Sequence, residues 1–94
     1  MELPSRIKRR IIKDHPQGDQ QTIEELLLEL MDYLKKTGID TERVIAATLL
    51  HADGKTDRLL NCIEEVRVDF RDILMDSGLE HADWPDRLDA EFGT

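Results

Sequence analysis

The sequence predicts an all-α protein, a single domain folded as a compact bundle of four to five helices. Apolar residues recur at helical spacing from Thr22 to Met75, and no stretch shows the sustained alternation that is typical of a strand. A chain of 94 residues has room for one hydrophobic core. Leucine, isoleucine and valine must build most of that core, because only 4% of the residues are aromatic.

A basic helix is expected over residues 5–14. It should end there, because Pro16 disfavours helical backbone at the residue before it. Residues 5–13 contain no Asp or Glu but five bases, which are Arg6, Lys8, Arg9, Arg10 and Lys13. An apolar stripe recurs every fourth position, at Leu3, Ile7 and Ile11. We expect this helix to dock on the rest of the chain through its stripe and its charges.

An acidic helical body is expected over residues 22–92, preceded by a loop over residues 17–21. Thr22 and Glu25 have the spacing of a capping box, in which each side chain bonds the backbone N–H of the other. A helix is therefore expected over residues 23–36. The glycine two positions further on can adopt the positive φ that ends a helix.

Two more helices are expected after this one. The first is expected to begin after residue 40 or 41 and to end by Gly54. The second is expected to begin near residues 56–57 and to end before Gly78. A straight helix of that length would extend roughly 30 Å, so we expect it to be the spine of the bundle.

A short last helix is expected near the end of the chain. Pro85 suits the first position of a helix, because its missing N–H would have no partner there in any case. Leu88 and Phe92 would then face the core, and Trp84 would fold back onto the bundle.

The charge is distributed unevenly along the chain. The sequence has 13 Lys and Arg residues against 21 Asp and Glu residues, a net charge of −8. Because residues 5–13 take five of the bases, residues 14–94 hold eight bases against twenty acids. An acidic body repels phosphates, so nucleic acid is disfavoured as a partner except through the basic segment.

The chain is expected to be cytoplasmic. No apolar run approaches the ~18 residues of a membrane span, so no span is expected. The N-terminal region lacks the apolar stretch followed by small residues that marks a signal peptide. Cys62 is the single cysteine, so no internal disulfide is expected.

The longest expected helix has two apolar faces. At 100° per residue, a core face holds Leu59, Cys62, Ile63, Val66, Phe70, Ile73 and Leu74. Leu60, Val68 and Met75 lie roughly opposite, and Arg71 shares their side. We expect another helix of the chain to cover this second face, and the alternative is a partner protein.

Arg71 has no acid three or four residues away on its own helix, so it is expected to pair with an acid on a neighbouring helix or to anchor a partner.

The tripeptide His-Ala-Asp occurs twice, at residues 51–53 and 81–83. Together His51, Asp53, His81 and Asp83 would be an adequate ligand set for zinc or manganese. His51 lies near an expected helix C-terminus, whose dipole and exposed carbonyls favour a histidine, and His81 lies in an expected turn, where any polar residue fits. No metal and no cofactor is therefore expected. Cys62 is expected to be a buried apolar side chain. The sequence contains neither a glycine-rich phosphate-binding loop nor the Gly-x-Ser-x-Gly motif of a nucleophile elbow. No catalytic residue is therefore assigned, and the chain is not expected to be an enzyme.

Two patterns resemble those of known helical proteins. Residues 46–55, Ala-Ala-Thr-Leu-Leu-His-Ala-Asp-Gly-Lys, resemble the Leu-Leu-His-Asp-x-Gly-Lys signature of HD-type metal-dependent phosphohydrolases. In that family adjacent His and Asp residues ligate the metal, whereas here Ala52 separates them, so hydrolase activity is a minor alternative. A wider pattern over residues 42–49, 52–54, 59–60 and 69–74 is similar to small bacterial helical domains, which favours a bacterial source and implies no particular activity.

The expected function is that of a small non-enzymatic protein–protein interaction module. Its expected contact residues are Leu60, Val68, Arg71 and Met75, with Arg9 and Arg10 as secondary candidates. The partner would be another protein or a second copy of the chain. One alternative is an acidic protein that neutralises a basic enzyme, as antitoxin and immunity proteins do. A lesser alternative is nucleic-acid contact through the basic segment.

Overall fold

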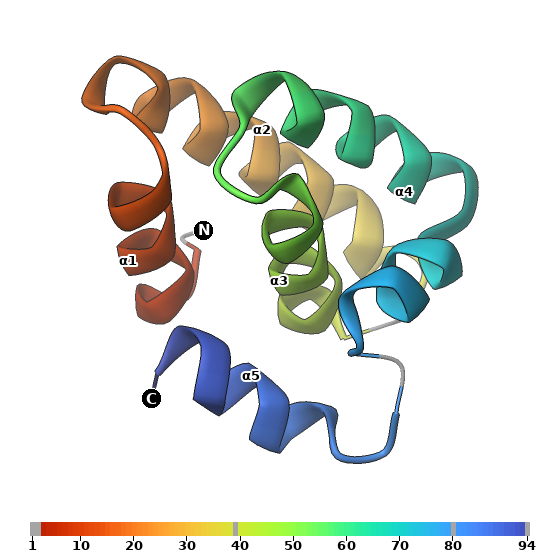
Figure 1. The fold of residues 1–94 in the computed structure, drawn as a ribbon. Helices are drawn as coiled ribbons and strands as arrows, with labels where there is room; N and C mark the ends of the chain where they lie inside the picture. The colour runs from red at the N-terminus through yellow and green to blue at the C-terminus, as the bar shows by residue number, and fades with distance from the viewer. Residues whose placement is uncertain (1–2, 39, 80, 94) are drawn as a thin grey trace.

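Five α-helices and no strand make up the part of the chain that the structure describes, residues 3–38, 40–79 and 81–93. The structure is a computed structural model, and its overall dimensions are 35 × 27 × 25 Å (Figure 1). The predicted all-α bundle is therefore confirmed. Within the described ranges, no helix combines the length and the apolar character needed to cross a membrane.

The central helix is α3 (Thr41–Ala52), around which the other four are arranged (Figure 1). Six consecutive residues, 44–49, are buried, which is typical of a helix covered on all sides. The helix begins after residue 40, as predicted. Asp40 caps it, because its side chain accepts a hydrogen bond from the Arg43 backbone N–H at 3.2 Å. The expectation that the longest helix is the spine was wrong, since the shorter α3 is the shared packing partner.

The basic helix α1 (Ser5–Asp14) docks as predicted. Its stripe of Leu3, Ile7 and Ile11 is buried in the common core. His15 follows with extended backbone, φ −121° and ψ 148°, as expected for a residue before proline.

The next helix, α2 (Gln17–Lys35), begins six residues before the predicted start. The expected loop over residues 17–21 and the capping box at Thr22 are therefore wrong. Pro16 occupies the N-cap position, and its extended backbone lets the helix begin at the following residue. Asp19 in the first turn accepts a hydrogen bond from the Thr56 hydroxyl at 2.9 Å, which stabilises this early start.

The fourth helix, α4 (Thr56–Ser77), has the predicted bounds and ends at Gly78 with φ 79°. It is not straight, because Asp69 has non-helical backbone with φ −156° and ψ 102°. The ribbon changes direction before its C-terminal end (Figure 1). The Asp69 carboxylate accepts a hydrogen bond from the Arg71 backbone N–H at 3.0 Å, the contact that an N-cap makes. Asp69 thus ends one helical segment and caps the next.

The last helix, α5 (Trp84–Phe92), carries Pro85 in its first turn, as predicted. Leu88 and Phe92 are buried, and Trp84 packs half-buried against the core. The Arg43 guanidinium stacks over the Trp84 ring at 5.2 Å from its centroid and holds the start of α5 against α3.

Candidate functional site

The second apolar face of α4 is uncovered. The exposed fractions are 43% for Leu60, 88% for Val68 and 58% for Met75. The expectation that another helix of the chain covers these residues was wrong, because α1 and α5 pack on α3 and on each other instead. The predicted core face is confirmed, with Leu59, Cys62, Ile63, Val66, Ile73 and Leu74 buried and Phe70 half-buried.

An acidic groove lies beside Val68. It has a volume of about 480 Å³ and is open to solvent, and its lining residues are Asn61, Glu64, Glu65, Val68, Asp69 and Asp72. Four of these six residues carry a carboxylate, and none of them is a base. The groove therefore combines a strongly exposed apolar side chain with concentrated negative charge.

On its other side, Val68 borders a second hollow of about 340 Å³ between α2 and α4. Tyr33, Arg67 and Arg71 are among its lining residues. The Arg67 guanidinium lies over the Tyr33 ring at 5.8 Å, and the Tyr33 hydroxyl donates a hydrogen bond to the Arg67 carbonyl at 3.2 Å. Val68 therefore projects between an acidic groove and an aromatic, basic one.

One expectation, that Arg71 pairs with an acid on a neighbouring helix, is wrong for the residues that the structure describes, where its ion-pair partner lies on α4 itself. Arg71 binds Asp69, two residues earlier on α4, with Nε at 3.2 Å from Oδ1 and Nη2 at 3.3 Å from Oδ2. This spacing brings side chains together only because the backbone is non-helical at Asp69. The hydrogen bonds from Arg71 hold the pKa of the Asp69 carboxyl below its usual range.

The kink also divides the predicted contact face. Leu60 and Val68 precede it on one helical segment, whereas Met75 follows it on another. We therefore centre the candidate site on Val68 and the acidic groove.

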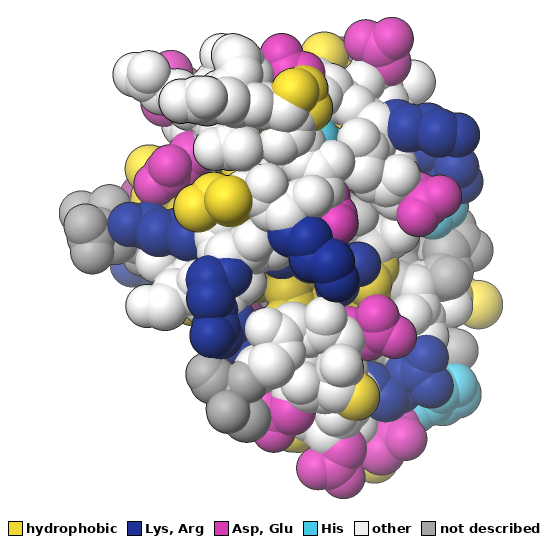
Figure 2. Space-filling model, turned by 60° about the vertical axis from the view of Figure 1, so that its left-hand side comes forward, with side chains coloured by type: hydrophobic (Ala, Val, Ile, Leu, Met, Phe, Trp, Pro, Cys, Tyr) yellow, Lys and Arg dark blue, Asp and Glu magenta, His cyan; other side chains and the backbone are white. Residues whose placement is uncertain are grey.

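The secondary candidates Arg9 and Arg10 lie on α1, together with the three other bases of residues 5–13. Figure 2 shows Lys and Arg side chains gathered on this side of the molecule, with Asp and Glu side chains among them. Arg10 is held within the chain, because its Nε donates to Asp14 at 2.6 Å and its Nη1 donates to the Glu91 carbonyl at 2.8 Å. Its guanidinium also covers the Phe92 ring at 5.0 Å from the centroid. These contacts leave Arg10 little capacity to bind a partner.

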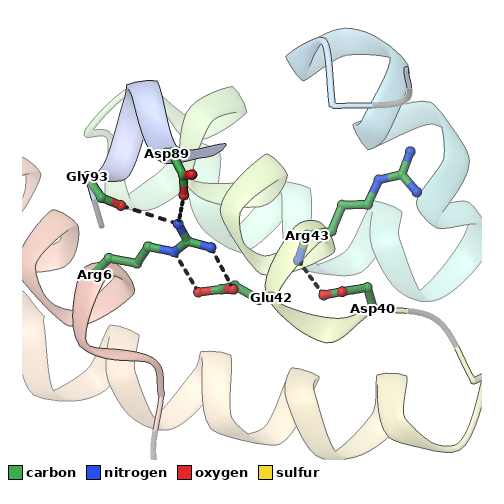
Figure 3. Close-up of polar contacts among 6 residues, drawn as sticks. All are labelled: Arg6, Asp40, Glu42, Arg43, Asp89 and Gly93. Atoms are coloured by element: carbon green, nitrogen blue, oxygen red, sulfur yellow. Dashed lines mark hydrogen bonds and ion pairs between the residues drawn. The ribbon is translucent and has the colours of Figure 1, made fainter. Parts of the chain in front are cut away.

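Arg6 is the main electrostatic link between α1 and the acidic body (Figure 3). It makes a bidentate pair with Glu42 of α3, at 2.8 Å from Nε and 2.9 Å from Nη2. Its Nη1 also bonds Asp89 and, at 3.3 Å, the Gly93 carbonyl of the chain end. The hydrogen bond to Glu42, supported by Asp89, raises the pKa of the guanidinium above its usual range despite partial burial. The expected electrostatic docking of the basic helix is confirmed.

A set of possible metal ligands lies where α3 packs on α4. The donor atoms of His51, Cys62 and Glu65 are all within 4.8 Å of one another. The structure does not place the other residues of the repeated tripeptide, Asp53, His81 and Asp83, in this group. Sequence reasoning missed the cluster because it depends on the packing of two helices. The one available signal was the spacing of three between Cys62 and Glu65, which puts them on the same side of α4.

Comparisons with protein-family models, with curated proteins and with solved structures found no match to this chain. Its function must therefore be inferred from its own residues.

Proposed function

We propose that the chain is a small non-catalytic protein–protein interaction module whose contact surface is the part of α4 around Val68. The observation that carries the proposal is the 88% exposure of Val68 beside a groove that is lined by four carboxylates. A valine in a well-packed monomer is ordinarily buried, and apolar side chains ringed by polar ones are typical of contact surfaces.

The charges of the groove favour a basic partner. Glu64, Glu65 and Asp72 present negative charge that would steer a segment rich in Lys and Arg towards Val68, whereas the charge of Asp69 is partly offset by Arg71. An apolar side chain of that segment would then pack on Val68 as it leaves water. A symmetric dimer through the same face is disfavoured, because a two-fold axis would bring each acidic groove against its copy.

Selection from a displayed peptide library tests the proposal without a known partner. The immobilised full-length chain should enrich peptides that carry an apolar residue flanked by Lys or Arg. Val68→Ser should weaken the selected peptides roughly tenfold, the effect of losing one central apolar contact. Ile12→Ser is the matched control, because Ile12 is also apolar and 64% exposed but lies on α1.

The charge requirement is tested separately. The double variant Glu64→Gln and Asp72→Asn removes two charges from the groove and leaves Val68 in place. It should weaken the same peptides and make their binding less sensitive to salt. Selected peptides without a basic excess, or peptides that bind the Val68→Ser variant as tightly as the unaltered chain, would show that the proposal is wrong.

The second candidate function is neutralisation of a basic enzyme, as antitoxin and immunity proteins achieve it. The same four carboxylates support it, together with twenty acids against eight bases in residues 14–94. In that case binding would depend on charge far more than on Val68. Affinity would fall steeply with ionic strength, and Val68→Ser would change it little. Nucleic-acid contact has less support, because Arg6, Lys8 and Arg10 all pair with carboxylates of the chain itself.

A further inference from the structure

His51, Cys62 and Glu65 form a cluster of which the proposed interaction surface uses only Glu65. His51 lies in the last turn of α3 and is half-buried, while Cys62 is 2% exposed on α4. Glu65 lies one turn further along α4 and is exposed. We propose that these three residues bind a divalent transition-metal ion of the zinc type.

The backbone holds the three side chains together. Cys62 and Glu65 are three residues apart on a helix, so their side chains lie one above the other. His51 approaches from α3, which packs along α4. The turn between the two helices is short and specific, with left-handed backbone at Asp53, φ 53°, and Gly54, φ 76°. The ligand positions are thus fixed by the packing of α3 on α4.

The donor set suits zinc rather than calcium or magnesium. It offers an imidazole nitrogen, a sulfur and a carboxylate oxygen, whereas calcium and magnesium take oxygen ligands. In a tetrahedral zinc site, bonds of about 2.0–2.3 Å place neighbouring donors roughly 3.3–3.8 Å apart. The donors here lie within 4.8 Å, so moderate rotations of the His51 and Glu65 side chains would close the site.

The surroundings allow a metal ion to enter. Glu65 is exposed and also lines the acidic groove, whose negative charge concentrates cations near the cluster. Cys62 provides the buried end of the site, where its bond to the metal would be shielded from solvent. Three protein ligands leave a fourth position for water.

The binding step is a simple ligand exchange. The Cys62 sulfur forms a bond to the metal as its S–H bond breaks, and the proton passes to solvent. His51 and Glu65 donate lone pairs and displace metal-bound water. No electron is transferred, so no oxidant or reductant is needed.

Titration of the full-length reduced chain with Co²⁺ tests the site, because cobalt adopts the zinc geometry and reports its ligands by absorption. One equivalent of Co²⁺ should give a thiolate-to-cobalt charge-transfer band together with the visible bands of a tetrahedral ion. Zn²⁺ should then displace Co²⁺ and abolish both features. Zinc at about 100 times its Kd should also raise Tm by roughly 10–20 °C, since only the folded chain forms the site.

Single variants assign the ligands. Cys62→Ser should abolish the charge-transfer band, and circular dichroism would check that this buried substitution preserves the fold. His51→Asn and Glu65→Gln, at less buried positions, should weaken Co²⁺ binding by about tenfold or more. The matched controls are His81→Asn and Glu29→Gln, a histidine and an exposed glutamate outside both the cluster and the acidic groove, and both should bind as the unaltered chain does.

Two results would overturn the assignment. One is Co²⁺ binding without a charge-transfer band, which would place the ion on surface carboxylates. The other is unchanged affinity in His51→Asn, which would remove the imidazole from the site. Neither result would bear on the proposed interaction function, because these measurements involve no peptide or protein partner.

Discussion

At the scale of single residues, Arg6 does the most to join separate parts of the fold. Its guanidinium bonds Glu42 of α3 and Asp89 of α5 from its position on α1. The sequence predicts that a basic helix docks on an acidic body. It does not identify which of the twenty acids receives which base, because that choice depends on helix packing.

Replacing Arg6 by Gln should lower the free energy of unfolding by about 1–2 kcal/mol, since a bidentate pair that is partly shielded from water is lost. Lys8→Gln is the control, because the Lys8–Glu24 pair is longer, at 3.7 Å, and more exposed. That variant should change stability by less than about 0.5 kcal/mol. Urea denaturation of both variants makes the comparison, and equal losses would contradict the role given to Arg6.

Asp69 gives a second prediction at this scale. Asp69→Ala should lower Tm by a few degrees, because the segment of α4 after the kink loses its cap. Asp69→Asn should be milder, since an amide oxygen also caps a helix. The sequence can show that Asp favours helix starts, but not that a start occurs inside a continuous apolar pattern.

The lowered pKa of the Asp69 carboxyl makes the stability of the fold depend on pH. Its pKa is lower in the folded chain than in the unfolded chain, so its ionised form stabilises the fold. This contribution is present at neutral pH and is lost as the pH falls below about 4, towards the lowered value. Thermal unfolding followed from pH 6 to pH 2 should show a larger loss of Tm in the unaltered chain than in Asp69→Asn. Parallel curves would show that Asp69 is uncoupled from folding.

At the scale of helices, the sequence predicts all five elements but misplaces the start of α2 and overlooks the kink in α4. The first error arises because two local signals for a helix start compete, and a distant contact decides between them. Thr22 has a valid capping pattern, yet Pro16 offers an earlier start, which the hydrogen bond between Thr56 and Asp19 stabilises. That bond joins residues 37 positions apart and cannot be deduced from local patterns.

The docking of α1 leads to a prediction about two isoleucines of the same helix. Ile7 is completely buried, whereas Ile12 is 64% exposed. Ile7→Ala should reduce the free energy of unfolding by about 2–4 kcal/mol, because it leaves a cavity in the core. Ile12→Ala should change it by less than about 0.5 kcal/mol. Chemical denaturation of both variants tests this difference, and a small effect of Ile7→Ala would mean that α1 is not part of the cooperative core.

At the scale of the whole molecule, the candidate site follows from where the helices do not pack. The sequence correctly separates the buried and exposed faces of α4, because that separation depends on helical periodicity. It does not predict that the second face stays uncovered, since α1 and α5 could have packed there. The residues that line the acidic groove recur at helical spacing along α4, so they share one face, and that this face stays open to solvent depends on how the other helices pack.

The charge around Val68 makes the association state a test of the whole arrangement. If the site binds a basic partner, the acidic grooves of two copies should repel each other. The chain should then sediment as a 10.9 kDa monomer. Sedimentation equilibrium at low and at high salt separates the possibilities, because screening weakens repulsion but leaves apolar contact unaffected. We expect a monomer at both salt concentrations. A salt-stable dimer that Val68→Ser dissociates and Ile12→Ser does not would instead make a second copy of the chain the occupant of this face.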